Sequence, residues 1–210
     1  MADWVTISSL ATAGATLALA GATFLSVRSA NRAARVAEDA LLAGIRPLLM
    51  PSRPDDPPIK VTFADSHLVM TPGGGGTAEV TDEAIYFTMS VRNVGSGIAV
   101  LHGWRIELSP DITTMERPPV ESFRRLTRDL YVASGDVAFW QGVYRDLSEP
   151  DVPAVTALIT GRSRIIVDLL YGDHQGGQRV IGRFSLLPRG EDAWQATVAR
   201  HWNVDRPDPR

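Results

Sequence analysis

The chain has no cysteine among its 210 residues, and lysine occurs only once, at Lys60. The absence of cysteine excludes disulfide bonds, thiolate zinc sites and cysteine nucleophiles. The net charge is −3 and the isoelectric point is near 5.8. A protein that coats nucleic acid usually carries a strongly basic face. We therefore expect no nucleic acid among its partners.

Local sequence signatures of catalysis and of cofactor binding are also missing. The four histidines, at positions 67, 102, 174 and 201, are too widely spaced for a local metal motif. The glycine run at residues 73–76 lacks the following Lys-Ser or Lys-Thr of a phosphate-binding loop. No Gly-x-Ser-x-Gly nucleophile motif occurs. These absences predict no catalytic, cofactor-binding or metal-binding residues and favour a protein that is not an enzyme.

The stretch without charge at the N-terminus is long. Residues 4–27 hold no ionisable side chain, and a helix of that length rises about 36 Å, against about 30 Å for a bilayer core. An interfacial aromatic residue is expected where Trp4 stands. We predict a transmembrane helix at residues 1–27. Its membrane-anchoring side chains include Trp4, Leu10, Leu17, Phe24 and Val27.

Two alternatives to a membrane span are weighed. A cleaved signal peptide could use Ala18-Leu19-Ala20 as its cleavage site, but its start would normally carry Lys or Arg, and none precedes the apolar run. A helix buried inside a globular domain would show a polar face, and no polar face interrupts this run. The membrane span is therefore the preferred interpretation.

Charge asymmetry predicts the orientation of this span. Arg28, Arg32 and Arg35 follow it, whereas only Asp3 and the terminal amine precede it. Positive residues that flank a span stay on the cytoplasmic side. We expect a single-pass protein of the inner (plasma) membrane, with the N-terminus outside and the soluble domain in the cytoplasm. Membrane lipid is accordingly an expected partner.

Helix-forming residues continue beyond the span. Residues 28–45 are predicted to form a juxtamembrane helix that ends at Gly44, because Pro47 cannot continue it. Within the span, Gly14, Ala18 and Ala22 are four residues apart. Small residues at this spacing let two helices approach closely, which would allow a helix–helix oligomer. The alternative is that an alanine-rich span produces the spacing by chance.

The rest of the chain is predicted to be mainly β. Residues 46–58 form a linker that includes a first short strand, and residues 59–210 form the domain. Short apolar or alternating runs between turn signals are typical of antiparallel strands. In residues 85–91, apolar side chains alternate with Tyr, Thr and Ser, as a half-buried strand requires. Ten strands are predicted, at residues 46–50, 59–64, 67–71, 84–93, 98–109, 130–133, 137–144, 164–171, 178–187 and 194–202.

The connections between these strands complete the expected fold. Turns are predicted at residues 93–97, 173–177 and 189–192, and a flexible loop at residues 72–76. The apolar residues Val120, Phe123, Leu126 and Leu130 recur at helical spacing and predict a short helix at residues 120–130. A second is expected at residues 152–159. The fold class is therefore an immunoglobulin-like, Greek-key antiparallel β-sandwich with one or two short helices, behind an N-terminal transmembrane helix.

Several of these features occur together in a known kind of protein. An N-terminal span, an Arg/Ala/Glu-rich helix, Arg46-Pro47 and an N-x-G-x-G-x-A strand and turn at residues 93–99 come in that order. A Tyr-x-Asp-x-x-Gly hairpin follows at residues 171–176. The chain resembles a loose group of uncharacterised bacterial single-pass membrane proteins with a β-sandwich domain. The resemblance implies the anchor and the fold, and it implies no activity. The Asn and Gly residues are interpreted as turn formers.

These observations lead to three hypotheses about function. The preferred one is a membrane-anchored, non-enzymatic accessory or scaffold protein that binds a protein partner through its β-sandwich. Arg124, Arg125 and Arg128 are the predicted contact with an acidic partner or anionic lipid, although Glu121 and Asp129 lie among them.

The alternative hypotheses use other parts of the chain. In the second, the protein is a small accessory subunit of a larger membrane complex, which it contacts through the transmembrane helix. In the third, it is a membrane-bound enzyme whose site is assembled only by folding. His102, Asp168 and His174 would be the first residues to examine for such a site.

Overall fold

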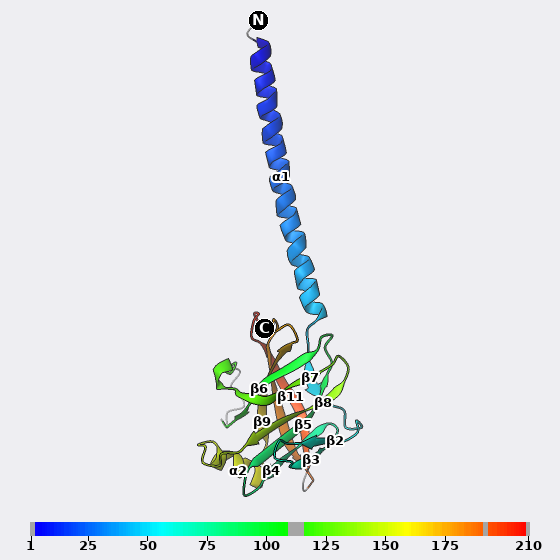
Figure 1. Ribbon diagram of the computed structural model, residues 1–210, viewed down its shortest axis with the longest axis vertical. Coiled ribbons are helices and arrows are strands. Elements are labelled where there is room, and N and C mark those ends of the chain that lie inside the picture. The colour runs from blue at the N-terminus through cyan, green and yellow to red at the C-terminus, as the bar shows by residue number, and fades with distance from the viewer. Residues whose placement is uncertain (1–2, 109–115, 191–192, 209–210) are drawn as a thin grey trace. The chain divides into compact units, whose positions relative to one another are not determined.

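The computed structural model describes residues 3–108, 116–190 and 193–208 (Figure 1). The side chain of Thr127 lies outside this description. The chain divides into two compact units, Met1–Gly44 and Ile45–Arg210. Each unit is described by itself.

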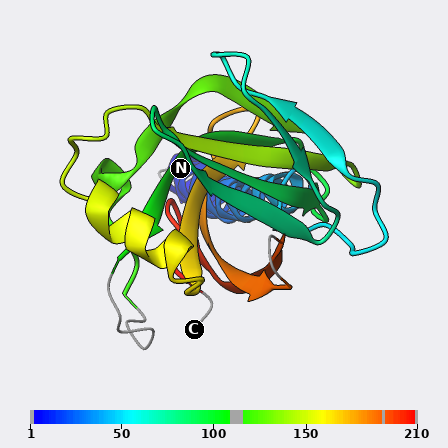
Figure 2. The same cartoon turned by 90° about the horizontal axis from the view of Figure 1, so that it is seen from below.

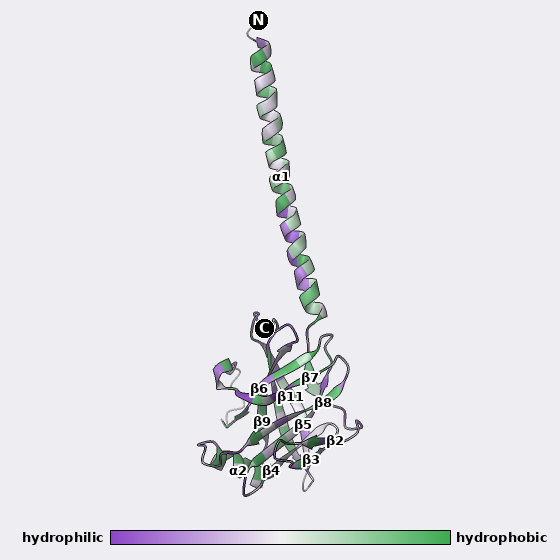
Figure 3. Cartoon of the chain, in the orientation of Figure 1, coloured by the Kyte–Doolittle hydropathy of each residue, from purple (hydrophilic) through white to green (hydrophobic). Residues whose placement is uncertain are grey.

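The first unit is a single helix, α1, from Asp3 to Gly44. None of its 42 residues is buried, and an 18-residue stretch has a mean hydropathy of 1.6. Figure 3 shows that purple, hydrophilic positions are concentrated in the half of the helix nearer Gly44. The helix is therefore long and apolar enough to cross a membrane, a property that an N-terminal signal sequence shares.

Hydroxyl groups in the apolar part of α1 bond to its own backbone. Thr12 Oγ1 donates to the carbonyl of Ser8 at 2.8 Å, and Thr16 Oγ1 donates to the carbonyl of Thr12 at 2.8 Å. Thr23 Oγ1 donates to Leu19 in the same way. Because these hydroxyls have partners within the helix, they cost less to place in an apolar environment than free hydroxyls would.

The second unit is mainly β, as predicted. Its helices are η1 (Val120–Ser122) and α2 (Val152–Thr160). Its strands are β1 (Leu49–Pro51), β2 (Ile59–Thr62), β3 (Leu68–Thr71), β4 (Gly75–Val80), β5 (Ile85–Asn93), β6 (Ala99–Glu107), β7 (Arg124–Val132), β8 (Val137–Tyr144), β9 (Ile165–Asp173), β10 (Val180–Arg189) and β11 (Ala193–Asn203).

Nine of these strands form one continuous antiparallel sheet, in the order β1-β5-β4-β11-β10-β9-β6-β7, with β8 added beside β5. One side of β5 pairs with β8 along its length. The other side pairs first with β4 and then, from Val91 to Asn93, with β1. These pairings establish the antiparallel, mainly β class. The strands β2 and β3 pair as a separate two-stranded sheet. The immunoglobulin-like wiring stays a prediction, because the nine strands follow one path.

The sheet curves so that its two ends enclose a common core (Figure 2). Trp104 of β6 and Trp140 of β8 belong to opposite ends of the strand order, yet their ring centroids are 5.6 Å apart. Phe87 of β5 lies beside both rings. The hairpin β2–β3 covers the outer face of β5, where Thr71 Oγ1 donates to Thr88 Oγ1 at 2.6 Å. The core therefore lies inside the curved sheet, with a smaller apolar cluster under the hairpin.

The predicted helix at residues 120–130 is wrong. One turn of 3-10 helix, η1, is followed by the strand β7. In β7, Arg125 pairs with Gly103 and Leu130 pairs with Leu101, so the four residues between them bulge out of the ladder. The bulge lets Leu126 and Leu130 both pack on the core. Because both of these residues reach the core, their four-residue spacing resembles that of a helix.

The predicted loop at residues 72–76 is wrong in its second half, because β4 begins at Gly75. A Cβ atom on Gly75 would lie 2.5 Å from the carbonyl oxygen of Trp194, and one on Gly76 would lie 2.3 Å from that of Thr88. These glycines therefore serve close packing of a strand between β5 and β11, a role that sequence alone does not separate from a loop. The helix predicted at residues 152–159 is confirmed by α2.

Candidate functional site

A double irregularity in the sheet creates a cavity in the domain. Along β6, Leu101 pairs with Tyr171 of β9 and Gly103 pairs with Leu170, so that His102 is an extra residue in its strand. On the other side of β6, the bulge of β7 faces the same position. Bulges re-aim side chains and often lie beside functional sites. Here the two bulges separate β6 from β7 and leave His102 between them.

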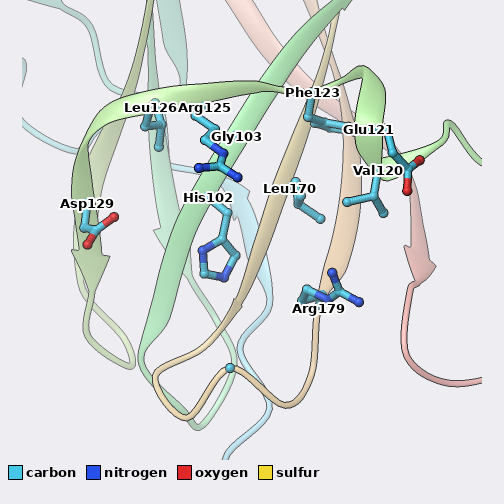
Figure 4. Close-up of a pocket in the computed structure, with 11 residues that line it drawn as sticks. His102, Gly103, Val120, Glu121, Phe123, Arg125, Leu126, Asp129, Leu170 and Arg179 are labelled. Carbon is cyan, nitrogen blue, oxygen red and sulfur yellow. The ribbon is translucent and has the colours of Figure 1, made fainter.

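The space at this bulge is a cavity of about 620 Å³ (Figure 4). This volume lies within the range of small-ligand pockets. Part of its wall is apolar, because Leu170 is buried in a cluster against which Val120 and Phe123 pack. The lining residues are His102, Gly103, Val120, Glu121, Phe123, Arg125, Leu126, Asp129, Leu170, Gly176 and Arg179.

His102 is a half-buried imidazole in the middle of this cavity, with Asp129 to one side and Arg125 above it in Figure 4. Burial lowers the pKa of His102 below its ordinary value of 6.5, because the charged form loses solvent. The charges of Asp129 and Asp173 oppose this shift, and the charge of Arg179 adds to it. The ring is therefore neutral near pH 7, and it can donate one hydrogen bond and accept another.

The two arginines of the cavity differ in their partners. Arg179 Nη2 donates to Asp205 Oδ1 at 2.7 Å, and its backbone N–H donates to Asp205 Oδ2 at 2.7 Å. Arg125 has no hydrogen bond or ion pair within the part of the chain that the structure describes, and the same holds for Asp129. Glu121, a further lining residue, likewise has no hydrogen bond or ion pair among the described residues. The cavity thus presents one cation, Arg125, and two anions, Asp129 and Glu121, whose charges are not already neutralised by an ion pair.

The arginines predicted as one contact cluster do not act together. Arg124 forms an ion pair with Glu149 and lies over the ring of Tyr144, 4.3 Å from its centroid. Arg128 donates to Gln141 Oε1 at 3.3 Å. These two side chains bridge β7 and β8, which are not paired as strands. Only Arg125 lines the cavity, so a contact with a partner or lipid stays a prediction for that residue.

The residues named for an enzyme site are not brought together. Asp168 of β9 is fully buried, and both of its oxygens accept bonds from Arg183, Nε at 2.7 Å and Nη2 at 2.8 Å. His174 is exposed in the turn after β9 and does not line the cavity of His102. Among the residues searched, no group of three or more His, Asp or Glu side chains could hold a metal ion.

The residues predicted for the membrane lie on α1 and are exposed. They are Trp4, Leu10, Leu17, Phe24 and Val27 for the anchor, Arg28, Arg32 and Arg35 for the topology, and Gly14, Ala18 and Ala22 for helix pairing. Their exposure is what a lipid-facing or partner-facing helix requires. Their roles stay predictions.

The motif residues interpreted as turn formers have a larger role. Asn93 is fully buried, and its Oδ1 accepts the N–H of Leu48 at 3.1 Å and that of Gly95 at 3.0 Å. Its Nδ2 donates to the carbonyls of Gly97 at 2.6 Å and Val132 at 3.0 Å. One side chain therefore satisfies four backbone groups, and it ties the turn at residues 94–97 to the start of the domain.

Further contacts hold the same starting segment, residues 45–49. A Cβ atom on Gly97 would lie 1.8 Å from the carbonyl oxygen of Ile45. Tyr171 Oη accepts the N–H of Leu49 at 3.3 Å, and His201 Nε2 donates to the carbonyl of Leu49 at 3.0 Å. We call Asn93, Gly95, Gly97, Tyr171 and His201 the junction clamp. Because its members lie far apart in sequence, only the spacing of Asn93 and its glycines gave a signal.

The Tyr-x-Asp-x-x-Gly motif at residues 171–176 contributes Tyr171 to the clamp, and Asp173 of the same motif holds the turn that follows. Asp173 is almost fully buried, and its Oδ1 accepts the N–H groups of Gln175 at 2.8 Å and Gly177 at 3.1 Å. Gly176 has a φ of +77°, which favours glycine. Since Gly176 lines the cavity, this turn fixes one wall of the candidate site.

Comparisons with known proteins returned no match. No protein-family profile, no curated protein and no solved structure matches the chain. The function is therefore argued from the geometry above.

Proposed function

We propose that the protein is a membrane-anchored, non-enzymatic accessory or scaffold protein whose β domain binds a protein partner at the His102 cavity. The observation that carries this proposal is the set of charged side chains without ion pairs, Arg125, Asp129 and Glu121, beside a neutral imidazole and an apolar wall. Convergent polar groups on an apolar wall are the usual composition of a binding site.

The cavity supports binding better than acid–base catalysis. A catalytic histidine is normally oriented by a hydrogen bond from a second group. His102 has no hydrogen bond within the described parts of the chain. Both oxygens of Asp168 accept hydrogen bonds from Arg183, and Oδ1 of Asp173 accepts two N–H groups of its own turn. Oδ2 of Asp173 is buried and has no hydrogen bond within the described residues. Recognition needs only the charges and shape that are present.

The anchoring part of the proposal is supported by α1. Its apolar stretch is long enough for a bilayer, and arginines follow that stretch directly. The proposed location is the inner (plasma) membrane, with the N-terminus outside and the β domain in the cytoplasm. The resemblance to bacterial single-pass membrane proteins with a β-sandwich domain is in keeping with such an anchor.

Site-specific photo-cross-linking in native membranes tests the partner site. A photoreactive residue at Glu121, which is exposed and lines the cavity, is expected to give one discrete adduct. The adduct should disappear when Arg125→Gln is added. The matched control position is Met70, which is 52% exposed on β3 and lies outside the cavity. An adduct from Met70 alone, or an adduct at Glu121 that is indifferent to Arg125→Gln, would refute binding at the cavity.

A second candidate function, a small subunit that contacts a larger complex through α1, is favoured by one observation. The helix continues for 17 residues after Val27, to Gly44, with no residue buried. Val36 and Leu41 in this part are 65% and 66% exposed. Removing residues 1–27 separates the candidates, because a soluble fragment that still gives the adduct at Glu121 uses its β domain.

A further inference from the structure

The cavity of His102 carries enough chemistry to define what part of a partner it receives. We infer that the cavity binds the carboxyl-terminal end of a polypeptide, with the terminal carboxylate paired to Arg125 and an apolar last side chain against Val120, Phe123 and Leu170. This inference rests on the proposed function and makes it specific.

Arg125 supplies the positive charge of the proposed site. Arg125 is exposed, and within the described residues its guanidinium is the one in the cavity without a carboxylate partner, because Arg179 is held by Asp205. A guanidinium matches the geometry of a carboxylate with two parallel N–H donors. A ligand with a carboxylate would therefore pair with the cationic group of the cavity that has no partner among the described residues.

The acceptors point to a peptide and not to a bare anion. Asp129 and Glu121 carry negative charges in the same cavity, and they would repel a ligand that offers only negative charge. The end of a chain offers backbone N–H groups a few ångströms from its carboxylate. Asp129 can accept one of these N–H groups, and the neutral ring of His102 can accept or donate a further bond.

The apolar wall adds a preference for the last side chain. Leu170 is 6% exposed and packs with Ile181 and Trp202 beneath the cavity. Val120 and Phe123 pack on this cluster from η1 and from the residue that follows it. An aliphatic or aromatic side chain placed on this wall would bury apolar surface on both partners.

The boundaries of the cavity favour a chain end over an internal acidic residue. Figure 4 shows Arg125, Leu126 and Asp129 of β7 around His102, and Gly176 of the turn after β9 also lines the cavity. A segment that continues in both directions must leave the cavity twice, whereas a chain end leaves it once. A volume of about 620 Å³ suits a ligand of a few residues.

Calorimetric titration of the full-length protein in nanodiscs tests the inference. The probes are N-acetyl-Ala-Leu-Leu with a free carboxylate and the same peptide with a terminal amide. Loss of a charge-assisted hydrogen-bond pair predicts that the acid binds about 10- to 100-fold more tightly than the amide. Arg125→Gln should reduce the acid to the affinity of the amide. The control Arg189→Gln, on an exposed arginine outside the cavity, should leave the difference unchanged.

Three results would overturn the inference. The first is equal affinity for acid and amide, and the second is the absence of binding by either peptide. The third is a strong preference for the unacetylated peptide that Asp129→Asn removes, because a free zwitterionic peptide would then be the ligand. If these titrations fail while the Glu121 adduct still depends on Arg125, the carboxylate assignment is wrong and the proposed function stands. If both fail, both are wrong.

Discussion

Asn93 Oδ1 accepts the backbone N–H of Leu48 at 3.1 Å, across 45 positions of sequence. Leu48 lies four residues after the end of α1, so this bond fixes the first part of the β domain that the chain reaches. The remaining bonds of the Asn93 side chain go to Gly95, Gly97 and Val132. Because the side chain is completely buried, no water can take its place as the hydrogen-bond partner of these backbone groups.

Asn93→Ala should therefore be strongly destabilising. Each buried backbone group that loses its partner costs about 1–3 kcal/mol, and partial relaxation of the turn makes a net loss of about 3 kcal/mol reasonable. For a domain of this size the melting temperature should fall by about 6–12 °C. Thermal unfolding followed by tryptophan fluorescence measures the change. Asn31→Ala, on the exposed face of α1, serves as the control, and an equally small effect of both substitutions would contradict the clamp.

Gly97→Ala tests the close contact in the same clamp. The added Cβ would lie 1.8 Å from the carbonyl oxygen of Ile45, so backbone must move. We expect a larger loss of stability than from Gly135→Ala, where the Cβ meets nothing within 4 Å and only the φ of +80° is unfavourable. A loss for Gly97→Ala no greater than the loss of about 1–2 kcal/mol expected at Gly135 would show that residues 45–49 are not held in this way.

Local patterns account for what the sequence predicts well. The apolar run of α1 and the alternation in β5 depend only on neighbouring residues, and both appear in the structure. The errors arise where distant contacts decide. Residues 120–130 look helical because a bulge places Leu126 and Leu130 on the core, and Gly75 looks like a loop residue because its partner is Trp194.

The candidate site was less predictable than the fold for the same reason. His102 becomes a cavity residue only because β6 gains one residue relative to β9, and no local pattern signals that register. The sequence shows the cluster of Arg124, Arg125 and Arg128. The different role of Arg125 depends on Glu149, which pairs with Arg124, and on Gln141 of β8, which accepts a bond from Arg128. Asp168 looked available for chemistry until its pairing with Arg183 was known.

That pairing gives a third prediction. Asp168→Asn removes the charge that Nε and Nη2 of Arg183 contact, and Glu107, 3.4 Å from Nη2, then remains as the anion beside this guanidinium, whose side chain is 9% exposed. Breaking a buried pair by removing one member costs about 3–5 kcal/mol. Asp205→Asn, which breaks the more exposed pair with Arg179, should cost about 1 kcal/mol or less. Urea unfolding compares the two variants. Equal midpoints would show that the buried pair stabilises the domain no more than the exposed pair.

The lowered pKa of His102 predicts how stability depends on pH. The unfolded chain binds a proton on this ring near pH 6.5, whereas the folded chain binds it only at lower pH. Between these values the unfolded state holds more protons, so the free energy of unfolding falls as the pH falls below about 6.5. His102→Asn should make this part of the pH profile flatter, and Asp129→Asn should lower the pKa of His102 further.

Two measurements check the assignment to His102. The ring signals of the four histidines can be followed by NMR during a pH titration, with His102→Asn identifying the signal. Chemical unfolding at about pH 7.5 and about pH 5 gives the stability difference. A His102 signal that titrates above its ordinary value, or an identical pH profile for His102→Asn, would contradict the burial of this ring in the cavity.

The sidedness of α1 is the last prediction. Arg28, Arg32 and Arg35 follow the apolar stretch with only Asp3 before it, so a reporter fused after residue 210 should be active in the cytoplasm and silent outside. Replacing the three arginines with glutamine and Ala2-Asp3 with two lysines should reverse this result. The wild-type chain should resist alkaline carbonate extraction and keep its full mass. Loss of residues 1–20 would instead identify a cleaved signal peptide, and an active external reporter on the wild-type chain would place the His102 cavity on the other side of the membrane.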